Sequence, residues 1–401
     1  MLPTTLRDEA TGTLRHTMRD GVVQDWDCLE ALLHRTFYGR LGWEAGADEG
    51  AVLFSEQVLT PRRDRERLAA LCFERFGLAG MFVAEAPVLA LYSVGRSSGL
   101  VADVGHDGAS VAAVVDGAAV AAASRRVTSG GGGGGEPSTS SSSSSSSSSL
   151  SAPLGGLAAE RVLRARVAAR VGDERAGAIP EDALRAAKHA VCRVAASAAE
   201  AAGSRGAAAA AAAAAASAAA AGGTGAPSTA PSKHVLPDGT ELEVTASDGA
   251  AAGEALVSPQ FFLPPSGGDG SGGASGGSSA DGGRQRQHPS LAELLSLALS
   301  SVPDANSRKL ASEGLLVCGG GSNAPGLGAR ILAEGGGALP PSHPAPPPLL
   351  SVPDYVPASM AASAAWAGGA ILARVVFQQQ QHVSRAEYDE FGPTVVHRKS
   401  A

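Results

Sequence analysis

Apolar residues recur with helical spacing in the first patterned block of the chain, which runs from about Gly21 to Val127. In the stretch DWDCLEALLHRTFYGRLG, the spacing of three and four residues predicts an amphipathic helix. Either Asp25 or Asp27 can cap its first turn, since a carboxylate there accepts from the free N–H groups. The predicted apolar face consists of Leu29, Leu32, Leu33, Phe37 and Leu41.

The stretch TPRRDRERLAALCFERFG predicts a second helix with the same periodicity. Thr60 is expected to cap it, Pro61 occupies the first turn and Gly77 ends it. We expect the charge run to form its solvent-exposed face. The apolar face is then made of Leu68, Leu71, Cys72 and Phe76.

Apolar runs between and after these helices predict strands. The segments are AVLFSE, GMFVAE, GLVADVG and ASVAAVVDGAAVAAA, and the last is expected to turn as a hairpin at Asp116-Gly117. We expect them to form one sheet that covers both helical faces. The block is therefore mixed α/β.

The later blocks alternate with low-complexity tracts. Helical patterns follow the Gly/Ser run, with Pro180 at an entry position, and the alanine run 207–221 is helical by propensity alone. The segment KHVLPDGTELEV predicts two strands joined by a Pro-Asp-Gly turn. Further on, Leu291, Leu294, Leu295 and Ala298 mark one face of a helix, and GLLVCGGG predicts a buried strand that ends in glycines.

Composition limits how much of the chain can fold. The 401 residues suffice for two or more cores, but 52 glycines, 24 prolines and 4% aromatic residues leave whole stretches with too little apolar surface. A formal charge of −7 argues against direct binding of nucleic acid through phosphate contacts. The four cysteines stand singly, without the spacing of a zinc site or a disulfide framework, and the N-terminus lacks the apolar core of a signal peptide. We therefore expect a soluble, intracellular protein whose cysteines are small core residues.

Two glycine-rich strand ends are the candidate chemistry. Asp103 closes an apolar strand and is followed by Gly105 and Gly108, a turn in which N–H groups can approach a phosphate while the carboxylate holds a metal ion through water. The run Gly319–Gly321 would let the backbone lie against a flat ligand. Either pattern alone is also typical of an ordinary turn. The histidines in patterned blocks have no serine or cysteine partner of the nucleophile-elbow type, so we interpret them as surface or core residues.

The tail WAGGAILARVVFQQQQHVSRAEYDEFGPTVVHRK resembles the C-terminus of the actin family. Further matches follow in actin order, in GVVQDWDCLEALLHRTFY, RERLAALCFERFGLAGMFVAEAPVLALYSVGRSSGLVADVGHDG, LPDGTELEV and LLVCGGGSNAPGLGARILAE. The resemblance implies an α/β, two-lobed fold of the actin and sugar-kinase type, with low-complexity insertions and without the N-terminal part of actin, since the match begins near Leu14. YGRLGWEAGADEGAVLFSE and ALYSVGRSSG are most similar to the plant-type class seven of actin-related proteins, a nuclear class.

The resemblance also divides the chain into actin subdomains. Subdomain 1 takes 14–92 and 346–401, subdomain 3 takes 93–128 and 287–345, and subdomain 4 takes the helical part 151–206 and the strands 233–263. The remaining segments are expected to be linkers, at 129–150 (Gly/Ser), 207–232 (poly-Ala/Pro) and 264–286 (Gly/Ser).

The resemblance implies a site for ATP or ADP with Mg²⁺ or Ca²⁺, but one that is altered. Its matching positions are Asp103 (to the metal through water), Gly105, Gly108, Lys188 and the adenine-facing Gly319, Gly320 and Gly321. Asp107 falls where actin has a glycine, and its carboxylate should repel phosphate. The glutamine and the histidine that act on the attacking water in actin fall at Ala86 and Ser110, and His189 replaces an acidic residue. We expect no hydrolysis of the actin type.

A second site implied by the resemblance is the apolar groove between the lower subdomains. Its lining positions are Tyr92, Gly95, Ser97, Gly117 and Ala365. A groove of this kind suits an amphipathic helix, although the same residues would serve plain packing between subdomains. The class implies a helix of a remodelling ATPase as the occupant, other chromatin-complex subunits or another actin-related protein as neighbours, and neither membrane nor direct nucleic-acid binding.

Three functions remain open at this point. The first, which we favour, is a non-catalytic scaffold subunit of a nuclear chromatin-remodelling assembly. The second is an ATP-binding cytoskeletal actin of the cytoplasm that polymerises. The third is a product of a truncated gene model of either kind, because repeat-rich sequence of this type favours such errors.

Overall fold

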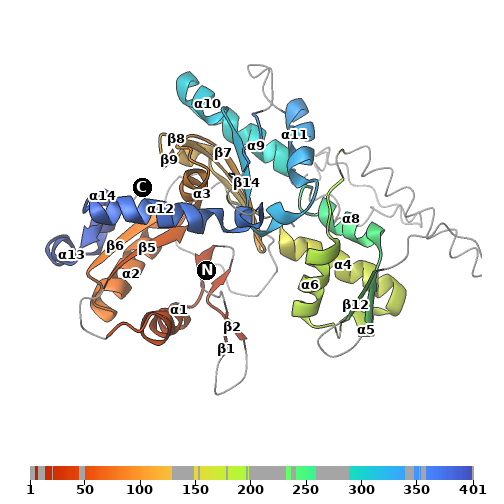
Figure 1. Ribbon diagram of the computed structural model, residues 1–401, viewed down its shortest axis with the longest axis horizontal. Coiled ribbons are helices and arrows are strands. Elements are labelled where there is room, and N and C mark those ends of the chain that lie inside the picture. Colours follow the sequence, from red (N-terminus) through yellow and green to blue (C-terminus); the bar gives the residue numbers. More distant parts are fainter. Residues whose placement is uncertain are drawn as a thin grey trace, which may run out of the picture.

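The computed structural model describes most of the patterned sequence. The described residues are 5–7, 14–19, 21–44, 50–128, 149–151, 154–177, 179–195, 197, 232–235, 241–258, 289–338, 347–351, 353 and 358–399. They form two main sheets, three two-stranded hairpins and a helical lobe that shares one core with the larger sheet. The lobe lies at the opposite end of the molecule from the C-terminal helices (Figure 1). The predicted alanine helix at 207–221 and the Pro-Asp-Gly turn at 237–239 lie outside the described residues.

The smaller sheet has the strand order β15-β6-β5, with β5 (Ala51–Glu56) parallel and β15 (Val383–Ser384) antiparallel to β6 (Gly80–Glu85). Met81 and Val83 of β6 pack on one face, and Phe82 and Ala84 pack on the other. Alternation in β6 thus gives this sheet two apolar faces. The helices that contribute to the first face are α1 (Trp26–His34) with η1 (Arg35–Arg40), α2 (Arg62–Ala70) with η2 (Leu71–Arg75), α13 (Arg385–Phe391), η7 (Pro393–Val395) and α14 (Val396–Lys399).

The larger sheet has the strand order β11-β10-β8-β7-β14, with β9 paired to β8. Its strands are β7 (Gly99–Val104), β8 (Gly108–Val115), β9 (Ala118–Ala119), β10 (Arg125–Thr128), β11 (Ser149–Ser151) and β14 (Leu315–Cys318). The helices that accompany it are α9 (Leu291–Ser300), α10 (Ala305–Ala311) and α11 (Leu327–Ala338), with the short turns η3 (Ala121–Ala123) and η5 (Gly320–Asn323). Leu291, Leu294, Leu295 and Ala298 are buried in its core, as their spacing predicts.

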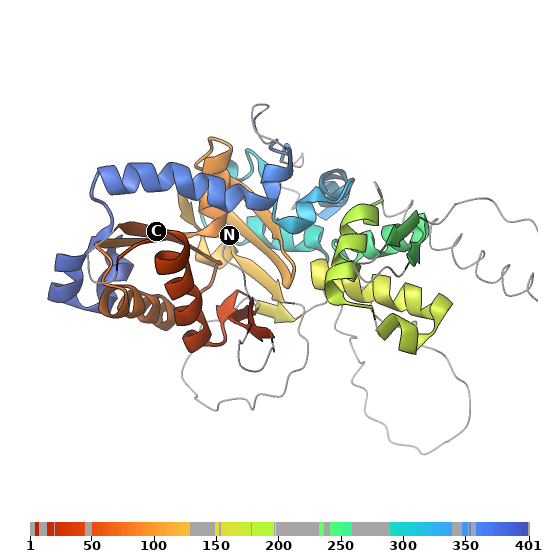
Figure 2. The same cartoon turned by 60° about the horizontal axis from the view of Figure 1, so that its bottom comes forward.

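Two helices join the sheets. The helix α3 (Ala86–Ser93) packs Leu89 in the core of the smaller sheet and Val88 and Leu91 in a cluster with β7, β8 and β14. The helix α12 (Ala364–Gln378), preceded by η6 (Ala358–Ser363), lies against α3 and runs along the upper left of Figure 2, beside the two sheets. Gly368 makes this contact close, because a Cβ there would collide with the carbonyl oxygen of Leu89.

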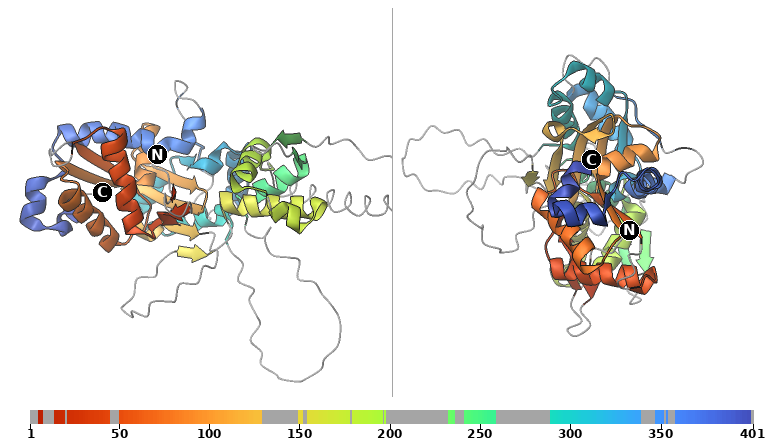
Figure 3. Two further views of the ribbon diagram at one scale, coloured as in Figure 1. Left: turned by 90° about the horizontal axis from the view of Figure 1, so that it is seen from below. Right: turned by 90° about the vertical axis from the view of Figure 1, so that its left-hand side faces the viewer.

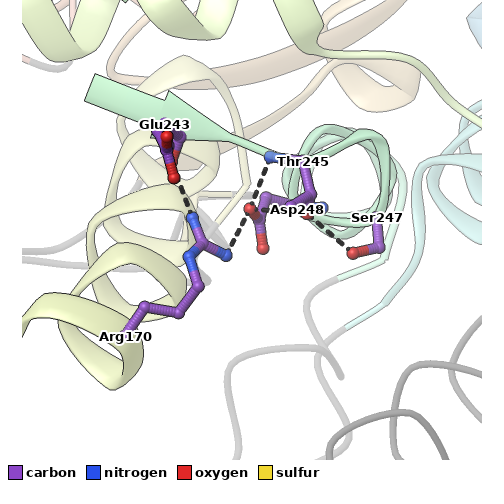
Figure 4. A network of polar contacts seen from close by, with 5 residues as sticks. All are labelled: Arg170, Glu243, Thr245, Ser247 and Asp248. Carbon is purple, nitrogen blue, oxygen red and sulfur yellow. Dashed lines mark hydrogen bonds and ion pairs between the residues drawn. The ribbon is translucent and has the colours of Figure 1, made fainter. Parts of the chain in front are cut away.

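The helical lobe contains α4 (Gly156–Val171), α5 (Asp173–Gly177), α6 (Glu181–Val191), α8 (Ala246–Glu254) and the hairpin of β12 (Ser232–Val235) and β13 (Glu241–Val244). Arg170 at the end of α4 links this helix to β13 and α8. Its guanidinium donates to the Asp248 carboxylate (2.6 Å) and to the Glu243 carbonyl (2.9 Å), while Thr245 and Asp248 cap α8 (Figure 4). Two small hairpins near the N-terminus, β1 (Thr5–Arg7) with β2 (Leu14–His16) and β3 (Met18–Arg19) with β4 (Val22–Val23), complete the described chain.

Several expectations are confirmed. The Asp25 carboxylate accepts from the Cys28 N–H and caps α1, and Asp116 and Gly117 both have positive φ (50° and 81°), as a tight hairpin turn requires. All four cysteines are buried and unbridged.

Three expectations are wrong in detail. Leu41 is 57% exposed, because the wider turn of η1 inserts a residue and rotates it away from the face of Phe37. Thr60 does not cap α2, since its hydroxyl donates to the Gln57 carbonyl (2.7 Å) and the helix begins at Arg62. The charge run is not wholly solvated either, because the Arg65 side chain is only 15% exposed and pairs with Glu56.

The prediction of a single sheet is also wrong. The chain leaves β6 into α3, whose residues from Ala86 to Leu91 are all buried. A helix that is apolar on all sides must be covered on all sides, so it separates β5 and β6 from β7 and β8. Figure 3 shows the resulting elongated body, with the larger sheet between the smaller one and the helical lobe.

One described segment, Met360–Gln378, has the length and apolar composition of a membrane-crossing helix. Its residues Ala364, Gly368, Gly369 and Val376 are nevertheless buried against the rest of the protein. We interpret it as a helix of the globular core.

The close contact between α12 and α3 predicts a stability difference between two glycines. Gly368→Ala should lower the free energy of unfolding by about 1–3 kcal/mol, because its methyl group would overlap the Leu89 carbonyl. Gly335→Ala in α11 is the control, since a Cβ there meets no atom within 4 Å, and it should stabilise by about 0.5–1 kcal/mol. Urea unfolding of the full chain measures both, and equal midpoints for the two variants would contradict the packing.

Candidate functional site

The two glycine-rich strand ends meet at one edge of the larger sheet. β7 and β14 are parallel neighbours in which Asp103 lies opposite Cys318, so Gly319 follows directly beside Asp103. A Cβ on Gly319 would collide with the Asp103 carboxylate, and Gly319 has a φ of +84° that favours glycine. Gly321 packs on Val104 in the same way, whereas nothing lies within 4 Å of a Cβ at Gly320. The edge is therefore shaped by missing side chains and opens at Gly320.

The turn after β7 is tight and is supported from the helical lobe. The Gly105 N–H donates to the Gly108 carbonyl (2.9 Å), which places His106 and Asp107 at the tip. The start of α4 packs against this turn, where the N–H groups of Gly156 and Leu157 donate to the carbonyls of Gly105 (2.9 Å) and His106 (2.7 Å). In the described part of the chain, no acceptor for the N–H groups of His106 and Asp107 is found. These two donors are available to a phosphate.

Lys188 reaches the same turn from α6, but its charge is already matched. Its side chain is buried, a Cβ on Gly156 would lie 2.9 Å from its Nζ, and this Nζ donates to Glu160 of α4 (2.8 Å). The Glu160 carboxylate also lies 3.7 Å from His106 Nδ1 and 3.5 Å from Arg185 Nε. Burial lowers the pKa of His106, although Glu160 opposes this. Glu160 thus takes the place that an anionic ligand would have beside Lys188.

His189, the neighbour of Lys188, is exposed. Desolvation is the main cause of its lowered pKa, and the charge of Lys188 adds to the effect. The residue that should be acidic by the family pattern is therefore a histidine at the surface of α6.

Asp103 is contacted from the smaller sheet, and we call the region bounded by Gln57, the turn at 105–108 and Gly319–Gly321 the crevice. Gln57, which follows β5 of the smaller sheet, donates from Nε2 to Asp103 Oδ2 at 3.5 Å. Burial raises the pKa of Asp103, and the bond from Gln57 partly offsets this. Within the described ranges, no group of three or more His, Cys, Asp or Glu side chains is arranged to hold a metal ion. A metal at Asp103 would consequently depend on water and on the phosphates of a nucleotide for its other ligands.

The residues fit nucleotide binding better than nucleotide hydrolysis. The turn N–H groups and Gly319–Gly321 suit a phosphate and a flat base, and a bound nucleotide would supply the phosphate charge there. Ala86, however, is a buried methyl group at the start of α3, and Ser110 is buried on β8 opposite Asp103. Neither residue can orient a water or take its proton near neutral pH. The Asp107 carboxylate at the turn tip, 3.9 Å from His106 Nε2, adds repulsion toward phosphate.

Four of the five predicted groove residues come together at the end of α3. The Gly117 N–H donates to the Ser97 carbonyl (2.8 Å), a Cβ on Gly117 would collide with the Tyr92 hydroxyl, and Gly95 is exposed beside them. Ala365 does not share their cluster. It packs with the core of the smaller sheet, whereas its neighbour Ala364 packs in the cluster of Tyr92.

Beyond this cluster of predicted groove residues, α12 carries two exposed apolar side chains on one face, Ile371 and Val375, which we call the apolar stripe. Ile371 (53% exposed) and Val375 (43%) follow Gly368 at helical spacing, beyond the point where α3 covers this side of the helix. Trp366 on the same helix is 60% exposed. The sequence reading missed these residues, as well as Glu160 and Gln57. The i, i+4 spacing of Ile371 and Val375 could have indicated an apolar helix face. A single polar residue such as Gln57 has no sequence pattern that predicts its role.

Two carboxylates meet at the ends of β5 and β6. Glu56 and Glu85 are in register on these parallel strands, and Arg65 binds Glu56. Burial, followed by the charge of Glu56, raises the pKa of Glu85 to about 7, although Arg65 opposes the shift. Glu85 stands directly before Ala86, so this group borders the crevice.

The raised pKa of Glu85 predicts how stability depends on pH. The folded state binds the proton of the Glu85 carboxyl more tightly than the unfolded chain does. The protonated carboxyl therefore makes its full contribution to the free energy of unfolding below about pH 4.5, and this contribution is lost as the pH rises through 7. Glu85→Gln should therefore stabilise the protein above pH 7, by at most about 3 kcal/mol. Urea unfolding between pH 5 and 8 tests this, with Glu390→Gln on exposed α13 as the control. Parallel pH profiles of Glu85→Gln and wild-type protein would contradict it.

Comparison with known proteins identifies the family of this chain. The sequence profile of the family described as Actin matches residues 4–401, so the expectation that the resemblance begins near Leu14 is wrong by ten residues. The chain is 31% identical to "Actin-related protein 7" of Oryza sativa over 382 residues, which cover 94% of this chain and 84% of the relative. It is 30% identical to "Actin-related protein 7" of Arabidopsis thaliana over 397 residues (99% and 87%), and 37% identical to "Actin-like protein 7B" of Mus musculus over 112 residues (28% and 26%). The chain belongs to the actin family.

Proposed function

We propose that this actin-related protein is a non-catalytic scaffold subunit of a nuclear chromatin-remodelling assembly, in which its groove binds a helix of the remodelling ATPase. The observation that carries the proposal is the apolar stripe of α12, whose Ile371 and Val375 are exposed beyond the cluster of Tyr92 and Ala364. Aliphatic side chains at helical spacing, exposed along a groove, suit the apolar face of a second helix. The similarity to actin-related protein 7, the class noted from the sequence, supports the nuclear setting.

The crevice supports the non-catalytic part of the proposal. Ala86 and Ser110 stand where hydrolysis would need polar groups that act on water, while the turn at His106 and Asp107 keeps its two N–H donors. In this proposal ATP or ADP, with Mg²⁺ or Ca²⁺, is a structural ligand that is bound without turnover. Other chromatin-complex subunits or a second actin-related protein would contact the remaining surface.

The first consequence concerns turnover. Purified full-length protein with ATP and Mg²⁺ should release phosphate no faster than buffer, because neither Ala86 nor Ser110, at the two positions that match the water-activating residues of actin, can activate a water. The double variant Ala86→Gln/Ser110→His is the matched comparison, since it restores the two polar groups in the same crevice. Turnover by the wild-type chain together with sedimentable filaments would instead support the cytoskeletal alternative.

The second consequence concerns the groove. Ile371→Asp should weaken the binding of a labelled peptide from the long helix of a remodelling ATPase by at least about tenfold, since burying an isoleucine contributes about 1.5–3 kcal/mol. Leu297→Asp on α9 is the control, because Leu297 is similarly exposed (48%) on a different helix. Fluorescence anisotropy measures both affinities. Equal affinities of wild-type protein and Ile371→Asp would exclude this stripe as the binding surface.

A further inference from the structure

The short segment 192–195, which follows α6, is held by three parts of the protein, namely α6, α8 and the residues before α11. Its four N–H groups donate to Lys188 of α6 (Cys192, 2.8 Å), Gly249 of α8 (Arg193, 3.3 Å), Pro325 before α11 (Val194, 2.8 Å) and the Glu254 carboxylate (Ala195, 3.2 Å). Such complete pairing outside helices and strands indicates a fixed position. We call this segment the strap.

Three glycines let the backbone of other elements lie directly against the strap and the residue before it. A Cβ on Gly249 or Gly253 of α8 would collide with the carbonyl oxygens of Val191 and Arg193. A Cβ on Gly326, at the start of α11, would collide with the carbonyl of Val194, and Gly326 has a φ of +90°. The strap is therefore enclosed between α8 and α11 without intervening side chains.

A buried ion pair fastens the end of the strap. Arg330 of α11 and Glu254 of α8 are each 2% exposed. Arg330 Nη1 donates to Glu254 Oε1 (3.1 Å), and Nη2 lies 3.0 Å from Oε2 as an ion-pair contact, although among the described residues Oε2 accepts no hydrogen bond. Arg330 also donates to the Ala195 carbonyl (3.2 Å) and to Glu334 (2.6 Å). A buried ion pair adds little net stability over apolar packing, but removing one partner is costly and the paired geometry is specific. Its contribution here is to fix the positions of α8, α11 and the strap relative to one another.

The strap connects the two walls of the crevice. On one side Lys188, four residues before Cys192, reaches the turn at 105–108, which we call the phosphate turn, beside Gly156 and His106. On the other side Gly321, four residues before Pro325, packs on Val104 at the base of the same turn. A displacement of the strap would thus move both walls.

We propose that the strap, fastened by Arg330 and Glu254, is a conformational lock that couples the α6 wall of the crevice to the glycine wall at 319–326. With the pair intact the two walls keep one spacing, and displacement of the strap moves them together. This inference concerns the crevice alone and does not depend on the groove or on its partner.

Hydrogen–deuterium exchange of the full chain tests the lock. Glu254→Gln should speed amide exchange at 188–195 and 319–326 together, by at least about tenfold, because the strap loses its fastening and opens more often. The matched control is Asp248→Asn. Asp248 lies on the same helix, is also buried (3% exposed) and also pairs with an arginine, Arg170, but it does not touch the strap.

The possible outcomes distinguish specific coupling of the two walls by the strap from a general loss of stability. Coupled exchange at both walls in Glu254→Gln, with both walls unchanged in Asp248→Asn, supports the proposal. Equal loosening in both variants, or loosening of one wall alone, overturns it. If Glu254→Gln fails to fold, Glu334→Gln is the second variant. Glu334 is the outer partner of Arg330, and its side chain is 22% exposed. This variant should speed exchange in the same two segments by a smaller factor. No change in either segment would then overturn the proposal.

Discussion

The pairing of β7 with β14 is the constraint on which the rest of the structure depends. These strands are more than 200 residues apart in sequence, and their parallel register sets Asp103 opposite Cys318. Because both strands end at the same edge, the phosphate turn and Gly319–Gly321 meet there. The same sheet also covers one side of α3, which in turn supports α12 and its apolar stripe. The crevice and the groove are therefore two sides of one packing arrangement.

Much of this arrangement could be predicted from the residues themselves. The spacing of apolar residues predicts the buried faces of α1 and α9, and the Asp116-Gly117 pair predicts the hairpin turn after β8. Both signals are local, because they depend only on residues close together in the sequence. The division into two sheets could not be predicted in this way, since it depends on α3 being covered on all sides by strands that lie far away in the chain. The resemblance to actin supplied Asp103, Gly319 and Lys188 as site residues, and the structure places all three around one turn. It could not supply Glu160 or Gln57, because their roles arise only when α4 and β5 are brought next to that turn.

The residues of the two candidate sites differ in how far the protein itself satisfies them. In the crevice, Glu160 matches the charge of Lys188, Gln57 contacts Asp103, and Ala86 and Ser110 replace the groups that act on water. Internal partners thus satisfy groups that a nucleotide would otherwise contact. On α12, by contrast, Trp366, Ile371 and Val375 remain exposed without a covering element in the described chain. Burial of such side chains is favourable, so Ile371 and Val375, which share one face of α12, would gain from a partner that covers them.

The central claim is that this family member acts through its groove and not through catalysis. Isolation of the native assembly from cells that carry either wild-type protein or Val375→Asp, followed by peptide identification, tests this most directly. The account predicts a remodelling ATPase with the wild-type chain and its loss with the variant. Recovery of filament proteins, or of the same ATPase with both forms, would contradict it.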